Sequence, residues 1–255
     1  QAVTYHYDVS NAFYSLWLDK RMVYSCAYFT SPDDDLDTAQ EKKLDYLCRK
    51  LRLQRGNRML DIGCGWGGLV IHAAKNYGVE AHGITLSGPQ ADLANERIRQ
   101  MGLSAYCRVE VRDYREMDAP ESYDKLVSVG MFEHVGEPRL REYFQAAFRL
   151  LRPGGTFLNH GIASNSGISA IPGPSFSDYY IFPDGKLLPL GTTLLAAEAS
   201  GFEVRDVECL REHYVLTLRK WLERLESRRE EACGATEERT YRLWRLYLAG
   251  ATHKF

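Results

Sequence analysis

A strand that breaks into a glycine-rich loop and then a helix is the feature that most constrains this chain. Residues 58–68 read Arg-Met-Leu-Asp-Ile-Gly-Cys-Gly-Trp-Gly-Gly, and a helical pattern begins near Leu69. Alternating glycines let backbone approach a bound molecule closely, whereas they weaken a strand–helix junction that has no use for them. The loop therefore predicts a ligand at this turn, and a tight turn without a ligand is the less favoured alternative.

Strand and helix patterns alternate along the middle of the chain. This alternation predicts an α/β fold with a mostly parallel central sheet and helices on both faces. Ligands of such sheets bind beyond the carboxyl ends of the strands, where we find Asp61, Thr85, Asp113, Glu133 and His160. The predicted strands are 59–62, 80–84, 107–112, 124–129, 156–160 and 202–207, and the predicted helices are 69–76, 89–100, 139–151 and 194–199.

Three segments lie outside this alternating core. Residues 1–55 contain an amphipathic stretch at 12–18, which predicts an N-terminal helical cap. Residues 163–190 are rich in glycine, proline and aromatics, and a long apolar connection at the ligand face is typical of a substrate lid. Residues 211–250 predict C-terminal helices, two of them charged and tryptophan-bearing within 215–250. We expect residues 1–255 to form one domain, a length that suits a single α/β core.

Composition excludes several classes of function. The net charge of −2 gives no electrostatic argument for nucleic acid, and the mixed-sign charge runs point to solvated helix faces. The apolar stretches are too short for a membrane span, and no signal-peptide pattern opens the chain. Six cysteines without a C-x-x-C spacing argue against zinc and against a disulfide framework. We therefore expect no metal and a reducing, cytoplasmic location.

The position of the acidic residue Asp61 relative to the glycines indicates which class of ligand the loop binds. In the dinucleotide fingerprint the acid follows the glycines by about 20 residues, whereas Asp61 precedes them here. The pattern D-x-G-x-G-x-G resembles motif I of S-adenosylmethionine (SAM)-dependent methyltransferases. Two narrower segments, Tyr-Ser-Cys-Ala-Tyr-Phe at 24–29 and Phe-Glu-His-Val-Gly at 132–136, extend the likeness. With them in order, the whole chain resembles the cyclopropane fatty acid synthase family, which includes the mycolic acid cyclopropane synthases; further matching segments are 6–10, 113–115, 160–162, 181–185 and 213–214.

The resemblance implies a Rossmann-like class I methyltransferase fold that holds SAM. Neutral side chains after the second strand would bind the ribose in place of an acid, and the glycines would make room for the amino-acid end of the cofactor. Asp113 would accept from the adenine amino group, for which a plain helix N-cap is the alternative. The implied cofactor-binding residues are Tyr24, Ser25, Asp61, Gly63, Gly65, Thr85, Leu86, Gln90, Asp113 and Tyr114.

The resemblance also implies a reaction. A methyl group is transferred to the cis double bond of an unsaturated fatty acyl chain, and a bound bicarbonate ion removes a proton from the resulting carbocation so that a cyclopropane closes. Such a cation requires a dry site with nearby negative charge or aromatic faces. Taken singly, His160 is typical of a core histidine and Cys26 of a small buried residue. The implied catalytic cage is Glu133, His160, Tyr214, Cys26 and Ile162, with Tyr7 and Phe182 as substrate-binding aromatics.

Several alternatives stay open at this stage. An amine N-methyltransferase would share the core, methyl or methylene branching would share the carbocation, and an idle lipid-binding protein would lack SAM binding. The acyl chain belongs to a phospholipid, a carrier protein or a mycolate, and contact with the inner membrane face is an open alternative to a purely cytoplasmic location. Ala251 stands where the family often has cysteine, which favours direct transfer, and Asn159 and Gly161 replace leucine and threonine beside His160. The oligomeric state stays unknown.

Overall fold

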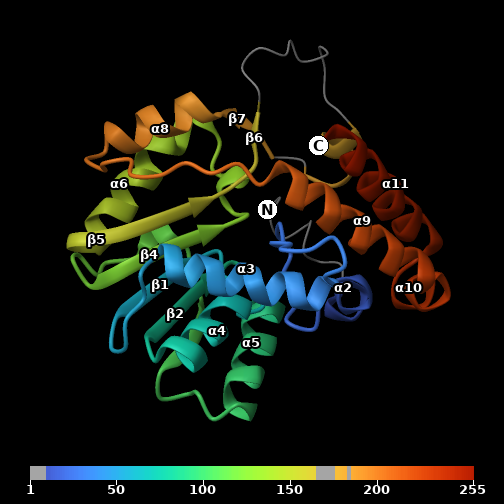
Figure 1. Ribbon diagram of the computed structural model, residues 1–255, viewed down its shortest axis with the longest axis horizontal. Coiled ribbons are helices and arrows are strands. Elements are labelled where there is room, and N and C mark those ends of the chain that lie inside the picture. The colour runs from blue at the N-terminus through green and yellow to red at the C-terminus, as the bar shows by residue number, and fades with distance from the viewer. Residues whose placement is uncertain (1–9, 165–175, 183–184) are drawn as a thin grey trace. The chain divides into compact units, whose positions relative to one another are not determined.

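The computed structural model describes residues 10–164, 176–182 and 185–255, and these form two compact units (Figure 1). One, here the sheet unit, comprises residues 47–172 and 184–207. The other, here the helical unit, comprises residues 1–46, 173–183 and 208–255. Tyr7 and residues 165–175 and 183–184 of the predicted lid lie outside the described residues, so the expectations for them stay predictions.

The sheet unit is built on a parallel sheet with the strand order β3-β2-β1-β4-β5. Helices α4 and α5 cover one face, and α6 and α8 cover the other (Figure 1). This confirms the predicted mostly parallel sheet flanked by helices. The strands are β1 Arg58–Ile62, β2 Glu80–Thr85, β3 Cys107–Val111, β4 Tyr123–Val129 and β5 Leu151–His160; the helices are α4 Gly68–Tyr77, α5 Gly88–Gln100, α6 Leu140–Leu150 and α8 Leu190–Glu198; a small parallel pair joins β6 Ala163–Ser164 to β7 Leu188–Pro189.

Apolar residues of the strands and of α6 make the core of this unit. Leu60 and Leu126 are wholly buried and pack with Ile84 in one cluster. Strands covered on both faces read as nearly continuous apolar runs, which is why they were visible in the sequence. On α6, Tyr143 and Phe144 lie three and four residues after Leu140, and all three face the core because residues at this spacing share one side of a helix.

The predicted sixth strand over residues 202–207 is wrong. These residues are irregular in structure, and no strand pairing involves them within the described part of the chain. Phe202 is held instead by aromatic packing, with ring centroids 5.3 Å from Phe148 and 5.6 Å from Phe157. Phe202, Val204 and Val207 give the segment apolar residues, but a strand also requires a neighbouring backbone to pair with.

The helical unit gathers aromatic side chains from helices far apart in the sequence. Trp17 is fully buried, with ring centroids 5.5 Å from Tyr24, 5.6 Å from Trp221 and 5.4 Å from Trp244. Such pairs add to the free energy of burial, so this cluster is the core of the unit. Its helices are α2 Asn11–Trp17, α7 Phe176–Tyr180, α9 Arg211–Ser227, α10 Arg229–Ala235 and α11 Glu238–Lys254, together with most of α3 Leu36–Lys50.

The C-terminal region differs from the two helices predicted within 215–250. A third, short helix α10 separates α9 from α11. The break lies at Arg228, whose φ of −120° and ψ of 36° are not helical. Among the described residues, no helix has both the length and the apolar character that crossing a membrane requires.

Candidate active site

The glycine loop is anchored to the end of β2 and leaves one glycine beside open space. The backbone N–H groups of Gly63 and Cys64 both donate to the carbonyl oxygen of Ile84, each at 2.9 Å. A Cβ on Gly63 would lie 2.6 Å from Met131 Cβ, and one on Gly67 would lie 3.0 Å from Ala94 Cβ. A Cβ on Gly65, whose φ is +55°, would meet nothing within 4 Å. Gly63 and Gly67 therefore serve close packing, whereas Gly65 offers exposed backbone to a ligand.

The end of β2 supplies neutral hydrogen-bonding groups. The Thr85 hydroxyl donates to the side-chain oxygen of Gln90 at 2.7 Å, and the Ser87 backbone N–H donates to Thr85 Oγ1 at 3.2 Å. Thr85 and Gln90 are buried, while half of Leu86 is exposed. The amide nitrogen of Gln90 keeps its two donors for another partner. The resemblance implies that these neutral groups bind the ribose, which stays a prediction.

Asp113 caps a short helix after β3, which is the structural alternative that the sequence left open. Its Oδ1 accepts from the Arg115 backbone N–H at 2.9 Å at the start of the 3₁₀ turn η1 Tyr114–Glu116. The hydrogen bond from the Arg115 guanidinium lowers the pKa of Asp113. An ionised carboxylate has further lone pairs and can accept another hydrogen bond besides those from Arg115. Recognition of the adenine amino group by Asp113 therefore stays a prediction. The Tyr114 ring meets the Tyr143 ring edge-on, with centroids 5.5 Å apart.

Glu133 is a partly exposed residue whose carboxyl group has one satisfied oxygen and one buried, unsatisfied oxygen. It lies in the 3₁₀ turn η2 Phe132–His134, directly after β4. Its Oε1 accepts from the Ile162 backbone N–H at 2.8 Å, while its Oε2 is buried and has no hydrogen-bond partner among the described residues. Burial raises the pKa of Glu133. A buried polar atom without a partner is costly, and a protonated carboxyl could donate from Oε2 to an oxygen of a ligand.

His160 ends β5 next to this acid. It pairs with Val129 in the parallel ladder, and its carbonyl oxygen accepts from Gly130 N–H at 2.9 Å. The sheet unit thus brings Glu133, His160 and Ile162 to the neighbouring carboxyl ends of β4 and β5. Asp61 is also buried, at the carboxyl end of β1 between β2 and β4.

Two contacts at this edge were not foreseen. Asn159, noted in the sequence only as a departure from the family, accepts the Tyr143 hydroxyl at 2.8 Å. A Cβ on Gly161 would lie 3.1 Å from the Phe132 ring, which gives a steric reason for glycine there. The buried aromatic face of α6 was the signal that could have suggested a polar partner for the Tyr143 hydroxyl.

The remaining predicted residues belong to the helical unit. The Cys26 sulfur lies 3.7 Å from the Leu210 carbonyl oxygen, and the Tyr214 N–H donates to the same oxygen at 3.0 Å, so these two predicted cage members lie near one another. Burial raises the pKa of Cys26 to about 12, which keeps the thiol neutral. Phe182 contacts Tyr247 edge-on with centroids 5.6 Å apart. Tyr24 lies in the aromatic cluster described above, and Tyr7 lies outside the described residues.

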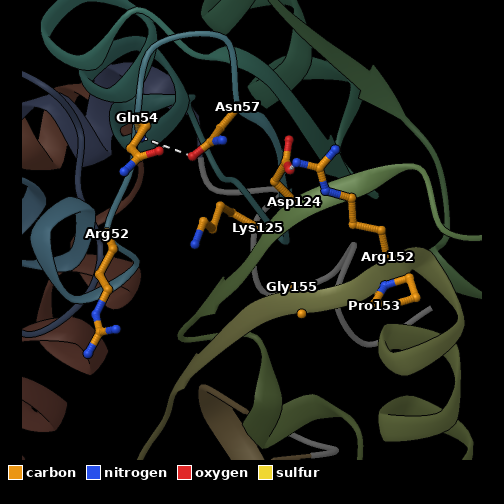
Figure 2. Close-up of a pocket in the computed structure, with 9 residues that line it drawn as sticks. Arg52, Gln54, Asn57, Asp124, Lys125, Arg152, Pro153 and Gly155 are labelled. Atoms are coloured by element: carbon orange, nitrogen blue, oxygen red, sulfur yellow. Dashed lines mark hydrogen bonds and ion pairs between the residues drawn. The ribbon is translucent and has the colours of Figure 1, made fainter.

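A cavity of about 330 Å³ lies at the opposite, amino-terminal edge of the sheet (Figure 2). Arg152 pairs there with Asp124, and the Gln54 N–H donates to Asn57 Oδ1 at 2.9 Å. None of the predicted site residues lines this cavity, and ligands of parallel sheets bind at the other edge. Its lining residues are Arg52, Gln54, Asn57, Asp124, Lys125, Arg152, Pro153, Gly154 and Gly155.

Comparison with known proteins finds relatives that are named fatty acid methyltransferases and cyclopropane synthases. A probable fatty acid methyltransferase of Pseudomonas putida is 48% identical over all of this chain and 66% of its own length. The cyclopropane-fatty-acyl-phospholipid synthase of Escherichia coli K12 is 38% identical over 98% of this chain and 63% of its own length. The chain thus spans about two thirds of these two relatives.

A solved structure gives the fold. The mycolic acid cyclopropane synthase CmaA1 in complex with SAH and CTAB is 35% identical, has a TM-score of 0.93, and aligns over 99% of this chain and 92% of its own. This likeness confirms the predicted class I SAM-dependent methyltransferase fold. The family model of mycolic acid cyclopropane synthetase matches residues 1–255. The chain therefore belongs to the mycolic acid cyclopropane synthetase family of SAM-dependent methyltransferases.

Proposed function

We propose that the chain transfers the methyl group of SAM to the cis double bond of an unsaturated fatty acyl chain and forms a cyclopropane. The observation that carries the proposal is Glu133: a buried carboxyl, bonded through one oxygen to Ile162 N–H and unsatisfied at the other among the described residues. A methyltransferase for a nucleophilic amine needs no group to manage a carbocation, whereas an alkene acceptor does.

The residues of the sheet unit fit SAM. Gly65 has room for a ligand against its backbone, and Thr85 and Gln90, which are bonded to each other after β2, present buried neutral groups. Bound SAM would supply an electrophilic methyl group. The protein's contribution is to hold the cofactor at the carboxyl ends of the strands and to keep water from the acceptor carbon.

The chemistry of Glu133 fits a small oxyanion such as bicarbonate. Its raised pKa favours the protonated acid, which can donate from Oε2 to an anionic oxygen while Oε1 stays fixed by Ile162. Bicarbonate held there, with His160 as its neighbour and Cys26 and Tyr214 as further proposed contacts, would supply a base for the proton lost on ring closure. Glu133 positions that base and controls its proton.

The decisive experiment is mass spectrometry of lipids from cells that express the protein and are fed methyl-labelled methionine. Cyclopropane formation predicts acyl chains heavier by one methylene unit, with the label retained in the ring and the double bond lost. A retained double bond or a saturated methyl branch would instead assign the branching reaction. Incubation with unsaturated phospholipid vesicles, with an unsaturated acyl carrier protein and with a mycolate precursor then separates the acyl carriers.

Amine methylation is the alternative from another substrate class. Coclaurine N-methyltransferase, solved with N-methylheliamine and SAH, is 25% identical to this chain with a TM-score of 0.79. Transfer of labelled methyl from SAM to a small amine, together with no labelling of unsaturated lipids, would decide for this alternative.

A further inference from the structure

The cavity at the amino-terminal edge of the sheet gathers more positive than negative charge. It is the 330 Å³ cavity of Figure 2, and the charged side chains of its lining are Arg52, Lys125, Arg152 and Asp124. All four belong to the sheet unit. The volume suits a small ligand, because small-molecule sites begin at roughly 300 Å³. Which ligand it suits depends on which of these charges already have a partner inside the protein.

Asp124 and Arg152 compensate each other. Asp124 pairs with Arg152 through Oδ1, and its Oδ2 accepts from the Arg58 N–H at 2.7 Å. Figure 2 shows the Arg152 guanidinium turned toward Asp124 and away from the Lys125 side chain. The one carboxylate of the lining is therefore committed to Arg152 and to the Arg58 backbone.

Arg52 and Lys125 line the same cavity, and neither has a carboxylate partner among the described residues. Lys125 is half-buried, and its ammonium donates to the neutral Thr156 hydroxyl at 3.3 Å. Burial, and then the positive charge of Arg52, lower the pKa of Lys125. An anion placed between two cations that repel each other stabilises both. An ammonium has three donors and a guanidinium five, so most of them remain for a ligand.

The backbone holds Arg52 in a conformation that favours glycine. Its φ is +51°, and the turn that ends α3 is closed by bonds from Arg52 N–H to the Arg49 carbonyl oxygen at 2.9 Å and from Leu53 N–H to that of Cys48 at 3.1 Å. Helices commonly end with glycine in this left-handed conformation, because a Cβ is strained there. The arginine therefore carries a local cost that ending the helix does not explain.

A bulge between β4 and β5 forms another wall of the cavity. Tyr123 pairs with Leu151 and Lys125 pairs with Thr156, so residues 152–155 lie opposite Asp124 alone. Bulges of this kind interrupt the ladder and re-aim side chains. Two of the bulge residues in the lining, 154 and 155, are glycines, so a ligand can approach the backbone closely there.

We propose that this cavity binds a phosphate-type oxyanion between Arg52 and Lys125, carried either by a soluble molecule or by a lipid headgroup. The planar guanidinium would form two parallel bonds to phosphate oxygens, and the ammonium would act as a point charge. The site lies at the edge of the sheet opposite the proposed cofactor loop. It therefore stands or falls independently of the proposed function.

Titration with inorganic phosphate tests the site. Calorimetry of the wild type should show saturable binding, and phosphate should raise the melting temperature more than sodium chloride of matched ionic strength, because a bound ligand stabilises the folded state by mass action. In Arg52→Gly and in Lys125→Met, the Kd for phosphate should rise about tenfold or more, as for a lost charge-assisted hydrogen bond. Lys75→Met is the matched control: it removes an exposed cation of the same unit outside the cavity and should leave the Kd within about twofold.

Vesicles of phosphatidylglycerol separate the two sources of the phosphate. Weaker sedimentation of Arg52→Gly and Lys125→Met with these vesicles than of Lys75→Met would assign the phosphate to a lipid headgroup. Equal sedimentation of the three variants, together with weakened binding of inorganic phosphate in the first two, would assign it to a soluble phosphorylated molecule.

Arg52→Gly also separates ligand binding from a structural role. Glycine relieves the positive φ, so this variant should be at least as stable as the wild type in phosphate-free buffer and yet lose the phosphate-dependent rise in melting temperature. Should Lys125→Met fail to fold, Arg52→Gly carries the same comparison. Wild-type protein without saturable phosphate binding, or a Kd that rises equally in Lys75→Met, would overturn the proposal.

Discussion

Two buried carboxyl groups at opposite ends of β4 differ in their surroundings. Asp124, at the amino end, accepts from the Arg58 N–H at 2.7 Å and pairs with Arg152 through its other oxygen. Glu133, just beyond the carboxyl end, is bonded through one oxygen only among the described residues. A satisfied buried carboxylate stabilises a fold, whereas an unsatisfied one costs free energy that a bound ligand can recover.

Two glycines extend the comparison to the backbone. Gly65 at the carboxyl edge has a φ of +55°, Gly154 at the amino edge has a φ of +77°, and a Cβ on either would meet nothing within 4 Å. The local strain of a substitution is therefore similar at the two positions. They differ in their surroundings: the loop of Gly65 leads into α4, while Gly154 lies beside the cavity of Figure 2.

The largest effect should come from Gly65→Val. A branched side chain would fill the space beside the loop and should abolish SAM binding in calorimetry. Gly154→Val is the matched control: it introduces the same side chain at a positive φ, so it should lower the melting temperature comparably and leave SAM affinity within about twofold. Unchanged SAM affinity in a folded Gly65→Val protein would refute the assignment of the loop.

The next effect should come from Glu133→Gln. The amide keeps the shape of the acid but cannot control a proton, so turnover should fall by roughly 10²-fold or more, as for other positioned acid–base groups. SAM affinity should change by less than about twofold. The measurements are methyl transfer to unsaturated lipid and SAM titration of the same preparation. A loss confined to SAM affinity would move Glu133 from the catalytic cage to the cofactor site.

Asp124→Asn should lower the stability of the protein and leave methyl transfer nearly unchanged, the reverse of Glu133→Gln. Neutralising this carboxyl weakens its bonds to Arg152 and to the Arg58 backbone, so the free energy of unfolding should fall by about 1–2 kcal/mol. Urea denaturation measures this change. Methyl transfer by the folded fraction should stay near the wild-type rate. A large loss of activity without loss of stability would give the amino edge a functional role.

Local sequence patterns predicted most of the sheet unit for physical reasons. Buried strands carry short apolar runs, such as Met59–Leu60 in β1 and Leu126–Val127 in β4, and the glycine loop needs its residues in one short stretch. Both signals are therefore readable from the sequence alone. The bonds between Tyr143 and Asn159 and between Lys43 and Ser25 join separate elements, and no local pattern encodes them. The wrong strand at 202–207 has the same origin, because pairing depends on a partner that the segment itself does not specify.

The smallest expected effect is on how folding stability changes with pH, and it should have opposite signs for Glu133 and Asp113. The pKa of Glu133 is raised by burial, so ionisation destabilises the folded state as pH rises above the ordinary value of 4.5. Glu133→Gln removes that penalty, and its stability relative to wild type should increase from pH 4 to pH 7.

The pKa of Asp113 is lowered by Arg115, so the stabilisation that the ionised Asp113 gives the fold is present above pH 3.8 and is lost as pH falls. Asp113→Asn should therefore be less stable than wild type at pH 7, with the difference shrinking toward pH 3. Urea denaturation of the wild type and the two variants across this pH range tests both signs, and parallel pH profiles for the two variants would contradict the opposite pKa shifts of Glu133 and Asp113.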